Sequence, residues 1–227
     1  MANELDRVKK AEVERFLDQA KAIPALAPAA GRLIFAMDAT ASREPSWDHA
    51  CRIQGEMFEA TAALGGLDVQ LVFYRGFNEC KASRWLRRAE DLHHAMRAVS
   101  CVGGETQIAR VLRHAKAEGK VNALVFVGDA MEEKIDTLSA LAGELGLLGV
   151  PVFLFQEGDD PVAERAFRQI ARLTNGAWCR FDAGSAADLR ALLGAVASFA
   201  AGGRQALEDY GKRAGGKALA LTHLMGQ

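Results

Sequence analysis

Oxygen-bearing side chains follow an apolar segment near the start of the sequence. Residues 32–37 carry no charge after Arg32, and Asp38, Thr40 and Ser42 then occupy alternate positions. One carboxylate and two hydroxyls are thus held at the end of a buried strand, where open α/β sheets usually bind their ligands. Oxygen is the ligand atom that hard divalent cations prefer. This spacing alone is a common pattern, and it indicates a cation site only together with donors from other loops.

Two further oxygen donors follow later elements. Thr106 lies in the glycine-containing segment 101–107, and Asp129 comes directly after the apolar segment 121–128. If the first and fourth strands are neighbours, as right-handed crossovers allow, the loops after these elements meet at one edge of the sheet. Two carboxylates and three hydroxyls suit Mg²⁺ or Mn²⁺ better than Zn²⁺. We therefore predict a metal site formed by Asp38, Thr40, Ser42, Thr106 and Asp129.

The elements that position these residues alternate between strand and helix. The hydrophobic periodicity predicts strands over 31–38, 68–74, 77–83, 121–129, 150–156 and 176–182, and helices over 47–64, 84–99, 106–119, 132–149, 160–174 and 186–201. The short connection at Arg75 and Gly76 indicates an antiparallel hairpin, whose second strand is polar enough for a sheet edge. The first strand is apolar on both faces and is expected at the centre. The pattern predicts a three-layer α/β/α, Rossmann-like fold around a six-stranded, mostly parallel sheet with one antiparallel edge strand.

This combination resembles a von Willebrand factor A (VWA) domain. The first three donors, followed by a threonine in a glycine-rich loop and an aspartate after an apolar strand, are similar to the metal-ion-dependent adhesion site of that family. Thr40 replaces the commoner serine with the same hydroxyl chemistry. The resemblance covers about residues 30–200. It implies the VWA fold, a divalent cation at the five positions above, and a partner protein that presents an Asp or Glu to the cation.

The sequence departs from the family pattern in the loop after the fourth strand. Many members have Thr-Asp-Gly there, whereas Asp129 lies between Gly128 and Ala130. The carboxylate is kept, but the residues that set the loop conformation differ. Glu132 and Glu133 follow closely, and we expect them to be acids of the first turn of the next helix rather than ligands, because the helix dipole favours negative charge there.

Two alternatives to a metal-dependent binding module use the same residues. Asp38, Ser42 and Thr106 could instead cap helices in a structural or scaffold domain of the same fold without a functional metal site. A metal-dependent phosphohydrolase of the haloacid dehalogenase type also places an aspartate after its first strand, but it needs a second aspartate where this chain has Thr40. The sequence contains no dinucleotide fingerprint, P-loop or nucleophile elbow. A binding module is therefore expected rather than an enzyme.

Composition and charge exclude other classes. The formal net charge of the 227 residues is −1, which gives no reason to expect nucleic-acid or membrane-surface binding. No apolar run approaches the roughly 20 residues that span a bilayer, and the charged N-terminus lacks the apolar core of a signal peptide. The four cysteines form no C-x-x-C pair, so they indicate neither a zinc site nor a disulfide framework. A cytoplasmic location is expected, while the sequence does not predict the oligomeric state.

The chain is expected to contain one domain over 30–201. An N-terminal helix over 3–22 and a proline-containing linker make up residues 1–29, and the helix carries an apolar stripe. Residues 202–227 form a C-terminal appendage, whose apolar residues pack either on the domain or on a partner.

Overall fold

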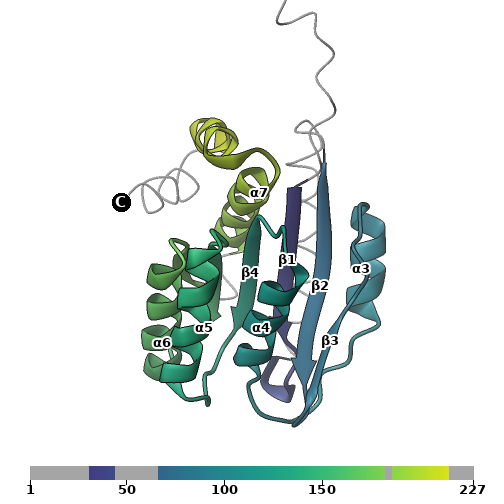
Figure 1. The fold of residues 1–227 in the computed structure, drawn as a ribbon. Helices are drawn as coiled ribbons and strands as arrows, with labels where there is room; N and C mark the ends of the chain where they lie inside the picture. Colours follow the sequence, from purple (N-terminus) through teal and green to yellow (C-terminus); the bar gives the residue numbers. More distant parts are fainter. Residues whose placement is uncertain (1–30, 44–65, 182–185, 215–227) are drawn as a thin grey trace, which may run out of the picture.

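A computed structural model describes residues 31–43, 66–181 and 186–214 of the chain (Figure 1). The helices expected over 3–22 and 47–64 lie outside the described residues. None of the helices in the described part combines the length and apolar character that crossing a membrane would require.

The described residues form one six-stranded sheet with the order β3-β2-β1-β4-β5-β6. Strand β3 is antiparallel to β2, and every other neighbouring pair is parallel. The central position of the first strand and the antiparallel edge strand are therefore confirmed. The strands are β1 (Gly31–Asp38), β2 (Leu67–Arg75), β3 (Glu79–Ala82), β4 (Ala123–Gly128), β5 (Val152–Glu157) and β6 (Ala177–Phe181).

Helices cover both faces of this sheet. They are α3 (Ala89–Arg97), α4 (Ile108–Glu118), α5 (Ile135–Leu147), α6 (Pro161–Leu173) and α7 (Ala186–Ala214), and a short 3-10 turn, η1 (Ala41–Arg43), follows β1. Leu33 and Phe35 of β1 pack in a cluster with α3 and α7, whereas Ile34 and Ala36 pack with α4, α5 and α6. Burial on both sides explains why β1 is apolar throughout.

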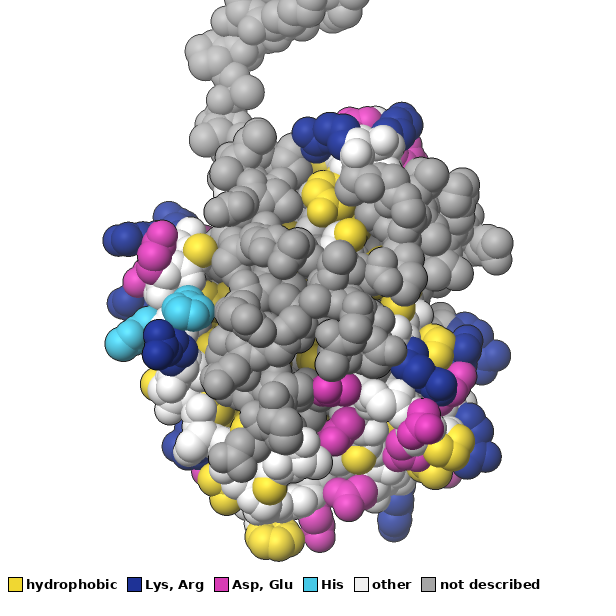
Figure 2. Space-filling model, turned by 180° about the vertical axis from the view of Figure 1, so that it is seen from behind, with side chains coloured by type: hydrophobic (Ala, Val, Ile, Leu, Met, Phe, Trp, Pro, Cys, Tyr) yellow, Lys and Arg dark blue, Asp and Glu magenta, His cyan; other side chains and the backbone are white. Residues whose placement is uncertain are grey.

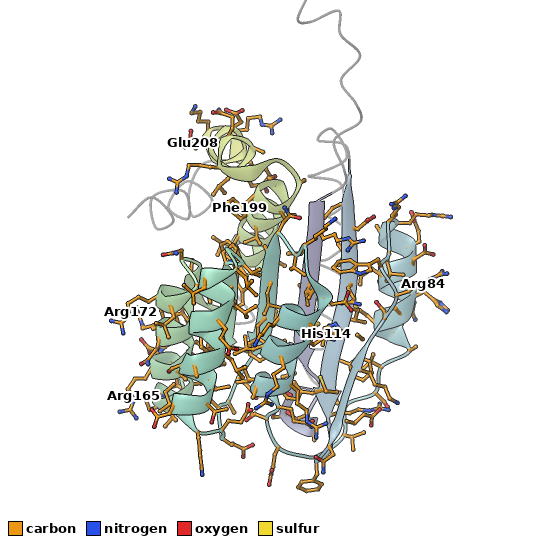
Figure 3. The ribbon with its side chains drawn as sticks, viewed as in Figure 1. Arg84, His114, Arg165, Arg172, Phe199 and Glu208 are labelled. Atoms are coloured by element: carbon orange, nitrogen blue, oxygen red, sulfur yellow. The ribbon has the colours of Figure 1, made fainter. Side chains whose placement is uncertain are left out.

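The helices turn their apolar sides to the sheet and their charged sides outward. Basic and acidic side chains are intermixed over much of the described surface seen in Figure 2. In Figure 3, Arg165 and Arg172 project outward from α6, while Phe167 and Ile170 of the same helix are buried. Phe199 of α7 meets Phe153 of β5 edge to face, with ring centroids 6.1 Å apart. These contacts form a core on each side of the sheet.

The helix expected over 84–99 begins later than the sequence suggests. Helix α3 starts at Ala89, and Leu86 instead forms an antiparallel bridge with Val69 of β2. The two residues exchange backbone hydrogen bonds of 2.7 and 2.8 Å. Trp85 is half-buried, and the Arg32 guanidinium lies 4.9 Å from its ring centre. Pairing with β2 thus replaces the first turns of the expected helix, and Trp85 packs against the core.

The hairpin turn and the last helix also differ from expectation. The turn between β2 and β3 covers residues 76–78 rather than 75–76, with Gly76 at φ 58°, a conformation that glycine adopts without strain. Helix α7 continues past residue 201 through a kink at Gly203, where φ is 68° and ψ is −161°. In the second half of α7, Leu207 is buried in the α3–α7 cluster.

Candidate metal site

The end of β1 places a carboxylate in the interior. Asp38 is fully buried and pairs in register with Tyr74 of β2. Its Oδ1 accepts a 2.7 Å hydrogen bond from the backbone N–H of Thr40, and its Oδ2 accepts a 3.0 Å bond from the Tyr74 hydroxyl. Burial raises the pKa of Asp38, and these hydrogen bonds oppose that shift. The carboxylate is therefore held in a fixed orientation.

Two hydroxyls lie side by side just beyond this carboxylate. Thr40 is 8% exposed, and Ser42 is exposed in the η1 turn. Their side-chain oxygens are 3.2 Å apart. The tight turn after β1 thus gathers the three oxygen donors of the first motif at the carboxyl edge of the sheet.

Asp129 approaches this group from the neighbouring strand. It directly follows β4, which pairs with β1, and a side chain at Gly128 would lie only 3.6 Å from Cβ of Asp38. The charge of Asp129 is one of the causes that raise the pKa of Asp38. Oδ1 of Asp129 is buried and has no hydrogen-bond partner among the described residues. A buried acceptor without a partner needs an explanation, and a bound cation is one.

Thr106 lies in the α3–α4 loop and is hydrogen-bonded to the β4–α5 loop. Its side-chain oxygen accepts a 3.0 Å hydrogen bond from the N–H of Glu132, and its own N–H donates a 3.0 Å bond to the Glu132 carboxylate. The next residue, Glu133, accepts bonds of 2.5 and 2.9 Å from the N–H groups of Ile108 and Ala109. The loop that carries Asp129 is thus fastened to the loop that carries Thr106.

The prediction that Glu132 and Glu133 lie in the first turn of the next helix was wrong. Helix α5 begins only at Ile135, so these acids do not lie in its first turn. They act instead on the N-terminus of α4, which belongs to an earlier part of the chain. Burial raises the pKa of Glu133, and the hydrogen bonds from the α4 amides oppose this shift.

The capping alternative does not account for Thr106. The residue before the first turn of α4 is Gln107, which makes no side-chain cap, and Glu133 supplies the acceptors for the first free amides. Gln107 instead donates from its side chain to the carbonyls of Arg75 and Gly76, at 3.1 and 3.0 Å. Thr106 is therefore held by anchors on both sides of its loop.

The structure brings oxygen donors from three loops to one edge of the sheet. Within 31–43, 66–181 and 186–214, no group of three or more His, Cys, Asp or Glu side chains could hold a metal, so a cation here would depend on hydroxyl ligands. The buried Asp38, whose pKa the nearby Asp129 charge helps to raise, the unpartnered Oδ1 of Asp129 and the neighbouring hydroxyls fit a hard divalent cation. The residues that would hold it are Asp38, Thr40, Ser42, Thr106 and Asp129.

Sequence reasoning missed Tyr74 as a member of this group. Its hydroxyl is fully buried, and burial together with the nearby Asp38 charge keeps its pKa well above the ordinary value, so it stays a donor. The available signal was its position at the end of the second apolar strand. A buried tyrosine, unlike a phenylalanine, usually has a hydrogen-bond partner for its hydroxyl, so one is expected at the same edge of the sheet.

The chain folds as an α/β/α sandwich, whose mostly parallel sheet has one antiparallel edge strand. Oxygen donors lie at the carboxyl edge of this sheet. Comparison with solved structures shows that the chain adopts the von Willebrand factor A fold. It is similar to a von Willebrand factor type A protein from Catenulispora acidiphila, with a TM-score of 0.59 and 16% identity over 75% of this chain and 43% of that one. The SpRpn10 VWA domain gives a TM-score of 0.57 and 13% identity over 68% of this chain and 89% of that one.

A third similar structure contains a metal. Proximal thread matrix protein 1 from the mussel byssus, in a form with a zinc-occupied MIDAS motif, gives a TM-score of 0.59 and 15% identity over 77% of this chain and 46% of that one. The chain therefore spans less than half the length of this protein and of the Catenulispora protein. No protein-family model matches the sequence, and no curated protein sequence matches it either. At these identities the likeness establishes the fold alone.

Proposed function

We propose that this chain is a protein-interaction module that binds an acidic side chain of a partner through Mg²⁺ or Mn²⁺. The observation that carries the proposal is the buried, unpartnered Oδ1 of Asp129 beside the buried carboxylate of Asp38. The VWA fold supports an interaction module, and the zinc in the MIDAS motif of the mussel protein supports a divalent cation.

The ligand set favours an anionic partner group. Asp38 and Asp129 together balance the charge of a divalent cation, while Thr40, Ser42 and Thr106 contribute oxygens without adding charge. A cation bound in this way supplies a Lewis-acidic position for one further oxygen. A carboxylate from a partner provides the strongest such ligand among protein side chains.

The surroundings make this binding depend on the cation. Figure 2 shows acidic side chains gathered around the lower end of the molecule, where β1 and β4 finish. Lys134 offsets part of this charge, and Arg75 is already paired with Glu79 at 3.0 Å. Without a cation, this edge would repel an acidic partner. Glu132 and Asp136 are exposed acids that follow β4 at this edge.

Apolar side chains beside the site could supply the contact area that one metal–carboxylate bond lacks. Phe77 is 69% exposed and Val102 is 45% exposed. Their loops lie together, because the N–H of Gly76 meets the carbonyl of Val102 at 3.4 Å. A specific interface needs about 1,000 Å² in total. We propose that this pair forms part of the rim that a partner covers.

Calorimetry with Mn²⁺ tests the metal site directly. Asp129→Asn removes one negative ligand without changing the size of the side chain, and we expect it to weaken Mn²⁺ binding by about tenfold or more. Asp159→Asn is the matched control, because it removes the same charge from an exposed acid after β5 and should leave the affinity nearly unchanged. Equal affinity of wild type and Asp129→Asn, or no binding by wild type, would contradict the proposal.

Partner capture tests the second half of the proposal. Proteins retained by the immobilised chain in Mn²⁺ should be released by chelator and should not bind Asp129→Asn. Replacing the acids of a captured partner one at a time should identify a single dominant residue. Capture that is equally strong in chelator would show that binding does not use the cation.

A further inference from the structure

Two carboxylates outside the proposed ligand set connect the two loops that carry Thr106 and Asp129. Glu132 and Thr106 exchange two hydrogen bonds of 3.0 Å, and each uses its backbone N–H as the donor. Glu133 receives the first free amides of α4, from Ile108 and Ala109. Four hydrogen bonds therefore join residues that are 24 to 26 positions apart in the sequence.

Glu133 is engaged in a way that leaves little capacity for a metal. Both of its carboxylate oxygens accept backbone N–H groups, and the side chain is partly buried. Its negative charge lies at the positive end of the α4 dipole, which adds to these bonds. Glu132 and Glu133 together hold the start of α4, and with it Thr106, against the β4–α5 loop. We call this pair the glutamate clamp.

A second anchor holds the Thr106 loop from the opposite side. Gln107 donates to two carbonyls of the β2–β3 turn, and the N–H of Glu105 meets the Gly76 carbonyl at 3.2 Å. Thr106 is thus fixed between the turn and the glutamate clamp. Hydrogen bonds that hold a metal-ligating residue in place orient its ligand atom, and removing them lowers the affinity for the metal.

We propose that Glu132 and Glu133 are positioning residues of the metal site. They set the distance between Thr106 and Asp129 and do not contact the cation themselves. This inference rests on the proposed function, because it assumes that Thr106 and Asp129 are ligands. In the β4–α5 loop, Ala130 stands where many VWA domains have glycine. The hydrogen bonds of the two glutamates would fix the conformation of this loop.

Glu133→Gln is the main test, with amide hydrogen exchange of the metal-free full chain as the first measurement. Glutamine offers one acceptor oxygen in place of two, so exchange at Ile108 and Ala109 should become about tenfold faster. Glu132→Gln should accelerate exchange at Thr106 and serves as a milder variant if Glu133→Gln folds poorly. The control is Glu105→Gln, which removes an exposed charge from the same loop and should leave this exchange unchanged.

Calorimetry with Mn²⁺ is the second measurement. We expect Glu133→Gln to bind one Mn²⁺ with about tenfold lower affinity, and Glu105→Gln to bind nearly as wild type does. Unchanged exchange in both clamp variants would overturn the proposal. So would complete loss of Mn²⁺ binding with unchanged exchange, which would make the glutamates ligands, or an equal loss of affinity in Glu105→Gln, which would reflect charge alone.

The two measurements separate this inference from the proposed function. If wild type bound no Mn²⁺, the proposed metal site would be refuted, and a positioning role for the glutamates would fall with it. If wild type bound Mn²⁺ but the clamp variants matched it in affinity and exchange, only the positioning role would be refuted.

Discussion

The hydrogen bond between Tyr74 and Asp38 offers a sharp test of the site's electrostatics. Tyr74→Phe removes one hydroxyl and keeps the ring, which is fully buried and stacks on Phe126 with centroids 6.2 Å apart. The substitution creates almost no cavity. It leaves Oδ2 of Asp38 without the 3.0 Å bond that it now accepts. The change in stability therefore reports on this one interaction.

The expected loss depends on the charge of Asp38. A hydrogen bond to a charged group contributes about 1.5–3 kcal/mol, against about 0.5–1.5 kcal/mol for a bond between neutral groups. We expect Tyr74→Phe to lower the free energy of unfolding by about 2 kcal/mol at neutral pH in the absence of metal. For a domain of this size, that loss corresponds to a Tm lower by about 4–8 °C.

The pH dependence has a definite sign. Burial raises the pKa of Asp38, so its ionisation in the folded state lowers stability as the pH rises through that value. The Tyr74 hydroxyl opposes the shift, and its removal raises the pKa further. The variant therefore loses most stability at neutral pH. Its deficit shrinks as the pH falls through the raised pKa, because both chains then carry a protonated Asp38.

Urea denaturation followed by circular dichroism, in chelator at neutral and at acidic pH, measures this difference. Asp38→Asn is the matched background: in that variant, Tyr74→Phe should cost only what a neutral bond contributes and should show no pH dependence. A deficit that is the same at both pH values, or the same in the Asp38→Asn background, would refute the reasoning.

Two glycine substitutions test packing around and away from the site. In Gly104→Ala the new Cβ would lie 2.0 Å from the backbone oxygen of Gly76, so the loop must move away. We expect the free energy of unfolding, measured by urea denaturation, to fall by about 1–3 kcal/mol, and Mn²⁺ binding, measured by calorimetry, to weaken. Gly103→Ala, whose Cβ would meet nothing within 4 Å, should change neither. In Gly194→Ala the Cβ would lie 2.2 Å from the Tyr210 hydroxyl, so hydrogen exchange over 204–214 should become faster. Combined with Tyr210→Ala, the same substitution should instead stabilise by about 0.5–1 kcal/mol, since alanine favours helix more than glycine does; loss of stability in that background would contradict the assigned contact.

The central sheet could be predicted because its signals are local and redundant. The apolar run of β1 is long, uninterrupted and followed by turn residues, and only a strand covered on both faces needs that pattern. The polar character of β3 marked it as an edge. Asp38 and Asp129 were placed at the same edge because parallel strands end at the same side of a sheet. These inferences required no knowledge of particular contacts.

The contacts that complete the site could not be predicted in the same way. The bond between Tyr74 and Asp38 joins residues 36 positions apart and follows from the register of β1 against β2. The sequence around Glu133 favours the first turn of a helix, and only the arrangement of α4 and β4 shows that its partner is an earlier helix. Leu86 could not be placed either, because it continues the helical periodicity of the following residues although its backbone pairs with β2.

The position of the site explains how the chain can carry an unfavourable arrangement of charge. Asp38 and the unpartnered oxygen of Asp129 both cost stability in the metal-free protein, yet both lie at the ends of strands. Two apolar clusters hold the sheet together on its two faces, so we expect the chain to fold without a metal. A cation that binds only the folded state then adds stability by mass action, about 2.7 kcal/mol at a hundredfold excess over its Kd. In the proposed metal site, these two carboxylates would be the main source of the affinity for a divalent ion.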